Sequence, residues 1–187
     1  MSYLDHTINQ WQLKSNFEAS YYYNFYKSLL TNKRLQNYLS SKNYELCYFP
    51  HDNMSASNKY FEGLDGFKFV LGEDRNYSKY FSESSIMVTD YSSTAFDFAY
   101  LRKPIIYCQG DFEEFFSGHT YTKGYYDYKK DGFGVITKTV DETVDEIIKL
   151  IENDCKVNEE YLERINKFFP FNDKKNCERV YKEIKKL

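Results

Sequence analysis

Proline and glycine are scarce in this chain of 187 residues. Three prolines and eight glycines are too few for a collagen-like fibre or a Pro/Gly-rich disordered segment. The four cysteines, Cys47, Cys108, Cys155 and Cys177, stand far apart without a CxxC pair. This spacing argues against a disulfide framework and favours reduced, structural thiols in a cytosolic protein. With 42% hydrophobic and 28% charged residues, the chain has the composition of a folded globular protein.

Long apolar runs and an excess of positive charge are also missing. No apolar run approaches the ~18 residues of a membrane-spanning helix, and residues 1–10 lack a basic segment followed by an apolar stretch. The formal net charge is −3, so no overall field draws in nucleic acid. We expect a cytoplasmic protein without a secretory signal or membrane-spanning helix, and one that does not bind nucleic acid.

Three common catalytic and cofactor motifs are absent as well. There is no G-x-G-x-x-G for a classical dinucleotide site and no G-x-S-x-G elbow for a Ser-His-Asp hydrolase. A DxD pair or a second carboxylate at ligand spacing is also missing. The sequence therefore predicts neither a bound metal nor a cofactor.

Short apolar runs alternate with segments of helical spacing through most of the chain. Strands are predicted over 44–49, 67–71, 86–89, 105–107 and 134–136, and the main helices over 32–42, 77–81, 94–101, 139–153, 159–168 and 174–186. This alternation predicts an α/β fold, a Rossmann-like and mainly parallel sheet with helices on both faces. We expect one domain over residues 1–187, with an aromatic-rich loop at 111–133.

The first 30 residues and the aromatic content each allow two interpretations. The segment Phe17–Tyr26 suits a helix, but its aromatic side chains also suit a surface that packs on a partner domain. Residues 1–30 are thus either part of the fold or an irregular, partner-packing segment. The aromatic share of 20% fits both biased codon usage and a sugar-binding surface.

The most informative stretch is Ile86–Leu101, where a predicted strand ends at Asp90 and a helix begins within Ser92, Ser93 and Thr94. Free backbone N–H groups, three hydroxyls and the positive end of the helix dipole meet there, which suits a bound phosphate. The alternative is structural, because serine commonly caps helices without binding anything else.

Asp90 and His51 each follow a predicted strand, and each has more than one plausible role. Asp90 suits turn fixation or a hydrogen bond to a substrate hydroxyl better than metal binding, because no second carboxylate stands at ligand spacing. His51 occupies the equivalent position on another strand, where an imidazole is either a surface residue or a donor to a phosphate oxygen.

The run Val88–Tyr107 resembles the signature of the CDP-glycerol glycerophosphotransferase family, which makes the polyol-phosphate chains of wall teichoic acids and some capsules. Further similar pieces follow in the family's order, namely 49–51, 111–115, 124–128, 131–134, 164–169 and 176–180. The resemblance implies the C-terminal, donor-binding half of a GT-B fold. It also implies that Ser92, Ser93, Thr94 and His51 hold the donor pyrophosphate.

The same resemblance implies that Asp111 and Glu114 approach the nucleoside or the glycerol; Asp90, from its position at the end of a strand, is a further candidate for substrate contact. The implied reaction is attack of an acceptor hydroxyl on the glycerol-bearing phosphorus of CDP-glycerol, or a related CDP-alditol, with CMP leaving. The implied acceptor is a lipid-linked glycan, which places such enzymes peripherally at the inner face of the cell membrane.

Two departures from the family pattern shape the expectation for this chain. It has Pro50-His51 where the family usually has His-Pro, and it lacks the N-terminal, acceptor-binding half with the expected base. We therefore expect donor binding without turnover. Two rival functions stay open: a nucleotide-sugar glycosyltransferase or epimerase half with the same fold, and a non-catalytic doubly wound interaction domain.

Overall fold

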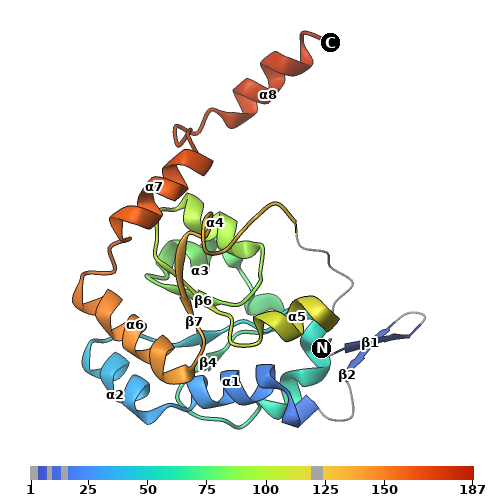
Figure 1. Ribbon diagram of the computed structural model, residues 1–187, viewed down its shortest axis with the longest axis vertical. Helices are drawn as coiled ribbons and strands as arrows, with labels where there is room; N and C mark the ends of the chain where they lie inside the picture. Colours follow the sequence, from blue (N-terminus) through green and yellow to red (C-terminus); the bar gives the residue numbers. More distant parts are fainter. Residues whose placement is uncertain (1–3, 8–9, 14–16, 119–123) are drawn as a thin grey trace.

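Three short parallel strands form the centre of the molecule (Figure 1). In the computed structural model, which describes residues 4–7, 10–13, 17–118 and 124–187, strands β5, β6 and β7 pair in that order. Their bounds are Met87–Thr89, Ile105–Cys108 and Gly134–Thr137. A Cβ at Gly134 would stand 1.8 Å from the carbonyl oxygen of Ile105. The close approach of β7 to β6 therefore requires glycine at this position.

A second parallel pair precedes this sheet in the chain. Strands β3 (Cys47–Tyr48) and β4 (Lys68–Phe69) pair over two residues each, and within the described residues no strand ladder joins them to β5. Near the N-terminus, β1 (Leu4–Thr7) and β2 (Gln10–Leu13) form an antiparallel hairpin. The predicted, mainly parallel α/β fold is confirmed, but β3 and β4 are much shorter than predicted and the parallel strands form two separate ladders.

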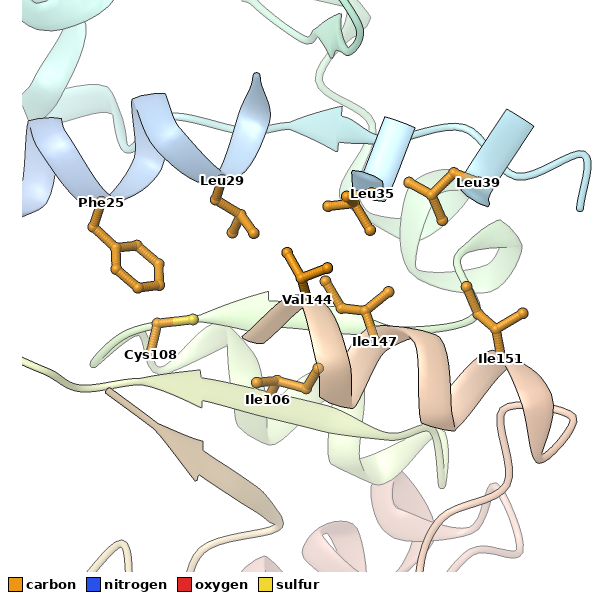
Figure 2. Packing of buried hydrophobic residues seen from close by; sticks show 9 residues of the cluster. All are labelled: Phe25, Leu29, Leu35, Leu39, Ile106, Cys108, Val144, Ile147 and Ile151. Atoms are coloured by element: carbon orange, nitrogen blue, oxygen red, sulfur yellow. The ribbon is translucent and has the colours of Figure 1, made fainter. Parts of the chain in front are cut away.

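One face of β6 is covered by three helices. They are α1 (Tyr21–Leu30), α2 (Lys33–Ser41) and α6 (Val140–Glu152). Figure 2 shows the side chains of α6 lying between those of α1 and α2 on one side and those of β6 on the other. The cluster consists of Phe25, Leu29, Leu35, Leu39, Ile106, Cys108, Val144, Ile147 and Ile151.

The opposite face of β6 carries the alternate side chains, Ile105 and Tyr107. They pack against α4 (Thr94–Tyr100) and against Ile165 of α7 (Glu159–Phe168), with α3 (Tyr77–Glu83) at the margin through Phe81. Successive residues of a strand point to opposite faces, so a strand buried throughout must be covered on both sides. This confirms the predicted helices on both faces of the sheet.

The aromatic segment before residue 32 contributes to this chain's own core. A short 3₁₀ turn, η1 (Phe17–Ala19), leads into α1, and the side chains of Phe17, Tyr23 and Phe25 are buried. Phe17 and Tyr23 belong to an aromatic cluster with Tyr48 of β3 and Phe61. These contacts hold the β3–β4 pair against α1.

Two segments differ from the predicted elements. Residues between β3 and β4 form a 3₁₀ helix, η2 (Asp52–Tyr60), and a short turn, η3 (Gly72–Asp74), follows β4. The loop predicted over 111–133 is wrong in its first part, because Phe112–Gly118 forms helix α5. The spacing of Phe112, Phe115 and Phe116, at i, i+3 and i+4, is helical. Residues 119–123 lie outside the described residues.

The last helix, α8 (Asn176–Ile184), extends away from the rest of the molecule (Figure 1). None of its residues is buried, and its apolar side chains Val180, Tyr181 and Ile184 are about 60% exposed. Among the described residues, no helix has the length and apolar character needed to cross a bilayer.

Candidate functional site

The candidate site lies at the carboxyl ends of the parallel strands. His51 follows β3, Asp90 follows β5 and Asp111 follows β6. Burial raises the pKa of Asp90, the charge of Asp111 raises it further and that of His51 lowers it, so His51 and Asp111 both lie within electrostatic reach of Asp90. Strands β3 and β4 form one parallel ladder, and β5, β6 and β7 form another in that order. Ligands of open α/β sheets bind outside the carboxyl ends of the strands.

The turn after β5 is held by hydrogen bonds from two directions. The backbone N–H of Tyr91 donates to Asp90 Oδ1 at 2.6 Å, and the side-chain amide of buried Gln109 donates to the carbonyl oxygen of Asp90 at 3.2 Å. Within the turn, Asp90 thus fixes its own backbone, which is one of the roles expected for it.

The two serines of the turn have different environments. Ser92 Oγ lies 2.8 Å from Thr94 Oγ1 and accepts from the backbone N–H of Thr94 at 3.3 Å, so its hydroxyl is used inside the turn. Ser93 is the N-cap residue of α4, yet it is exposed and its side chain makes no capping hydrogen bond. The capping interpretation therefore fits Ser92, whereas the hydroxyl of Ser93 is exposed to solvent.

Asp90 is a carboxylate in a poorly hydrated setting. Burial raises its pKa, and Asp111 raises it further, while the hydrogen bond from Tyr91 and the charge of His51 act in the opposite direction. Burial also raises the pKa of nearby Tyr26 and Tyr48, and the charge of Asp90 adds to that effect. Asp90 is thus surrounded by phenol groups that stay protonated at neutral pH.

Asp111 immediately precedes helix α5, and Glu114 lies in the first turn of that helix. Asp111 is buried, with 8% of its surface exposed, and its Oδ1 accepts a hydrogen bond from Tyr91 Oη at 2.8 Å. Glu114 is exposed on α5, one turn further along the chain. The structure therefore brings Asp90, Asp111 and the serine turn to the carboxyl edge of the β5–β7 sheet, with Asp111 turned toward the protein interior and Glu114 exposed.

Sequence reasoning missed two residues of this edge, Tyr91 and Gln109. Tyr91 bonds to Asp111 and stacks on Phe115 of α5, with ring centroids 3.7 Å apart. Gln109 is a polar residue at the end of a fully buried strand and is 2% exposed. A buried amide almost always has hydrogen-bond partners, so this position was a recognisable signal.

Residues 12–186 match the sequence profile of the family described as CDP-Glycerol:Poly(glycerophosphate) glycerophosphotransferase. The chain belongs to this family. The match includes the whole β5–α4 turn, His51, Asp111 and Glu114. The predicted resemblance to the glycerophosphotransferase family is therefore confirmed.

Characterised relatives and solved structures agree with this membership. The chain is 35% identical over 171 residues to the minor teichoic acid biosynthesis protein GgaB of Bacillus subtilis (strain 168), which covers 91% of this chain and 18% of that protein. It is 26% identical over 122 residues to a teichoic acid poly(glycerol phosphate) polymerase of the same organism, which covers 65% of this chain and 16% of that protein.

A structure of the wall teichoic acid polymerase TagF shares the fold, with a TM-score of 0.60 and 23% identity over 84% of this chain and 38% of that one. The chain spans less than a fifth of the length of the two Bacillus subtilis relatives.

Proposed function

We propose that this chain is the donor-binding part of a CDP-glycerol glycerophosphotransferase. The observation that carries the proposal is the β5–α4 turn. It presents the exposed hydroxyl of Ser93 at the start of α4, just beyond the carboxyl end of β5. Family membership supports CDP-glycerol as the donor. The structure of TagF H444N soaked with CDPG, whose chain is 22% identical to this one, has the same fold.

In this proposal the diphosphate of the donor lies over the turn. The hydroxyl of Ser93 donates to its oxygens, that of Thr94 does so in exchange for its bond to Ser92, and His51 approaches from the end of β3. Ser92 and Asp90 hold the shape of the turn, and Asp90 also contacts a donor hydroxyl. Asp111 and Glu114 form the wall beyond the turn. Donors held in place before reaction are what phosphoryl transfer needs most, because charge accumulates on the phosphate oxygens.

The proposed reaction breaks the bond between the glycerol-bearing phosphorus and the CMP oxygen. An acceptor hydroxyl attacks that phosphorus, its proton passes to a base, and CMP leaves with the bonding electrons. We assign no residue of this chain as the base. The role proposed for these residues is donor binding, and turnover requires in addition a bound acceptor and the base that receives its proton.

Calorimetric titration of the chain with CDP-glycerol tests the donor site. We expect binding that weakens about tenfold in Ser93→Ala, the loss of one hydrogen bond to a charged group. Ser82→Ala is the matched control, since that hydroxyl bonds to the carbonyl oxygen of Lys79 within α3. A wild-type chain that binds no CDP-glycerol, or a Ser93→Ala variant of unchanged affinity, would contradict the proposal. UDP-sugars in the same cell test the nucleotide-sugar alternative.

We also propose a lipid-linked acceptor and a peripheral location at the inner face of the membrane for the complete enzyme. Helix α8 supports this, because its apolar side chains are exposed beside Lys182, Lys185 and Lys186. Co-sedimentation with anionic vesicles should fall in Ile184→Glu, while thermal stability stays unchanged because α8 buries nothing. Tyr125→Glu, at a tyrosine 91% exposed, is the control. Equal sedimentation of both variants would contradict the assignment to α8.

A further inference from the structure

Tyr91 connects the turn after β5 to the turn after β6. Its hydroxyl donates to Asp111 Oδ1 at 2.8 Å, and its backbone N–H donates to Asp90 Oδ1 at 2.6 Å. Its ring lies flat on the ring of Phe115, with an interplanar angle of 16°. One residue therefore contacts the carboxylates of both turns and is held in place by α5.

Gln109 fixes the same turn from the neighbouring strand. Its backbone N–H donates to the carbonyl oxygen of Thr137 at 2.9 Å, which continues the pairing of β6 with β7. Its side-chain amide donates to the carbonyl oxygen of Asp90. Gln109 therefore holds the Asp90 carbonyl oxygen next to the end of β6, a strand that is buried throughout.

We propose that Tyr91, Gln109 and Asp111 are positioning residues for the donor site, and that Asp111 acts through Tyr91 rather than on the donor. This inference rests on the proposed function of the β5–α4 turn. Three observations support it. Asp111 is buried, its Oδ1 is occupied by the Tyr91 hydroxyl, and Tyr91 immediately precedes the two serines of the turn.

The hydrogen bond between Tyr91 and Asp111 also explains why the serines differ. Because Tyr91 is anchored at its backbone and at its hydroxyl, the chain leaves it in a fixed direction. Ser92 is then turned toward Thr94 and Ser93 toward solvent. A looser Tyr91 would let the turn rotate, and a hydroxyl displaced by about 1 Å loses much of a hydrogen bond to a phosphate oxygen.

Affinity for CDP-glycerol, measured calorimetrically, tests the inference. Tyr91→Phe and Asp111→Ala should each weaken binding about tenfold, and the double variant should be no weaker than the poorer single one, because both remove the same bond. Asp111→Asn keeps an acceptor oxygen and should stay within about threefold of wild type. Tyr44→Phe is the control, since that hydroxyl faces the thiol of Cys155, and it should bind like wild type.

Two outcomes would overturn the inference. If Tyr91→Phe binds like wild type while Asp111→Asn loses as much affinity as Asp111→Ala, then Asp111 contacts the donor directly. Additive losses in the double variant would mean that the two residues act independently.

Amide hydrogen exchange provides a test that needs no ligand. The N–H groups of Thr94 and Ala95 bond to Ser92 Oγ and to its carbonyl oxygen, so they should exchange faster in Tyr91→Phe, with α6 unchanged. Unchanged exchange at both positions contradicts the inference. If the wild-type chain binds no CDP-glycerol, the proposed function is wrong, and the exchange result still decides whether Tyr91 orders the turn.

Discussion

We expect Lys103 to contribute more to the free energy of unfolding than lysines whose ammonium groups are exposed to solvent. Its Nζ donates to the carbonyl oxygens of Phe81, Ser82 and Ser84 at 2.8, 2.7 and 2.6 Å. These carbonyls end helix α3, which has no buried residue of its own, and the chain then enters β5. The ammonium thus joins the start of β6 to the segment that carries the candidate site.

The size of the effect follows from these three bonds. A hydrogen bond to a charged group contributes about 1.5–3 kcal/mol, but burial lowers the pKa of Lys103, which shows that desolvation offsets part of this sum. We expect Lys103→Met, which keeps the apolar stem, to lower the free energy of unfolding by about 2–3 kcal/mol. For a chain of this size that corresponds to a melting temperature lower by roughly 4–12 °C.

Urea unfolding followed by circular dichroism measures this change. Lys129→Met is the matched control, because Lys129 is exposed and such substitutions usually stay within about 0.5 kcal/mol. If Lys103→Met were no more destabilising than the control, water would bond to the three carbonyl oxygens equally well. That result would contradict the stabilising role given to Lys103.

Three further predictions concern a helix cap and two titrating groups. Thr139→Ala should destabilise the chain by about 1 kcal/mol in urea unfolding, because Thr139 and Glu142 form a complete capping box at the start of α6; an unchanged midpoint would contradict this. Asp90→Asn should raise stability at pH 7 by about 0.5–2 kcal/mol. The folded-state pKa of Asp90 is raised by burial, so its contribution favours folding at low pH and is lost as pH rises, and the gain should vanish below about pH 4. A gain that persists there, measured by thermal melting across pH, would argue for packing instead. Burial raises the pKa of the Cys108 thiol to about 12, so between pH 9 and 12 the thiol loses its proton only in the unfolded chain. The free energy of unfolding should therefore fall by about 1.4 kcal/mol for each pH unit in this range. Cys108→Val should reduce that slope, and an unaltered slope would assign it to other groups such as Cys47.

Alternation of short apolar runs with helical spacing was sufficient to predict the α/β fold, because strands and helices that bury their faces leave different periods. The helix predicted over 139–153 likewise agrees with α6, whose N-cap is Thr139. Helix α5 was missed although its phenylalanines have helical spacing, since they were grouped with the aromatic residues that follow. Two-residue strands such as β3 carry no periodic signal beyond their neighbours.

The turn after β5 was recognisable from the order of Asp90, Ser92 and Ser93, but the division of labour between the serines was not. It depends on a hydrogen bond to Asp111, which lies 20 residues from Tyr91 in the chain. Such a contact follows from which strands lie next to each other, and strand adjacency is not encoded in local spacing. Gln109 acts in the same way, across the β5–β6 boundary.

The division of the parallel strands into two ladders has a thermodynamic consequence. His51 stands on the β3–β4 side, whose ladder spans two residues per strand, and the serine turn stands on the β5–β7 side. A diphosphate that bonds to both would connect two units that are otherwise joined through α1, which packs against both. Part of its binding free energy would then be spent on ordering the weaker unit. Donor binding should therefore slow amide exchange in β3 and β4, and the affinity of the site will depend on the stability of the aromatic cluster.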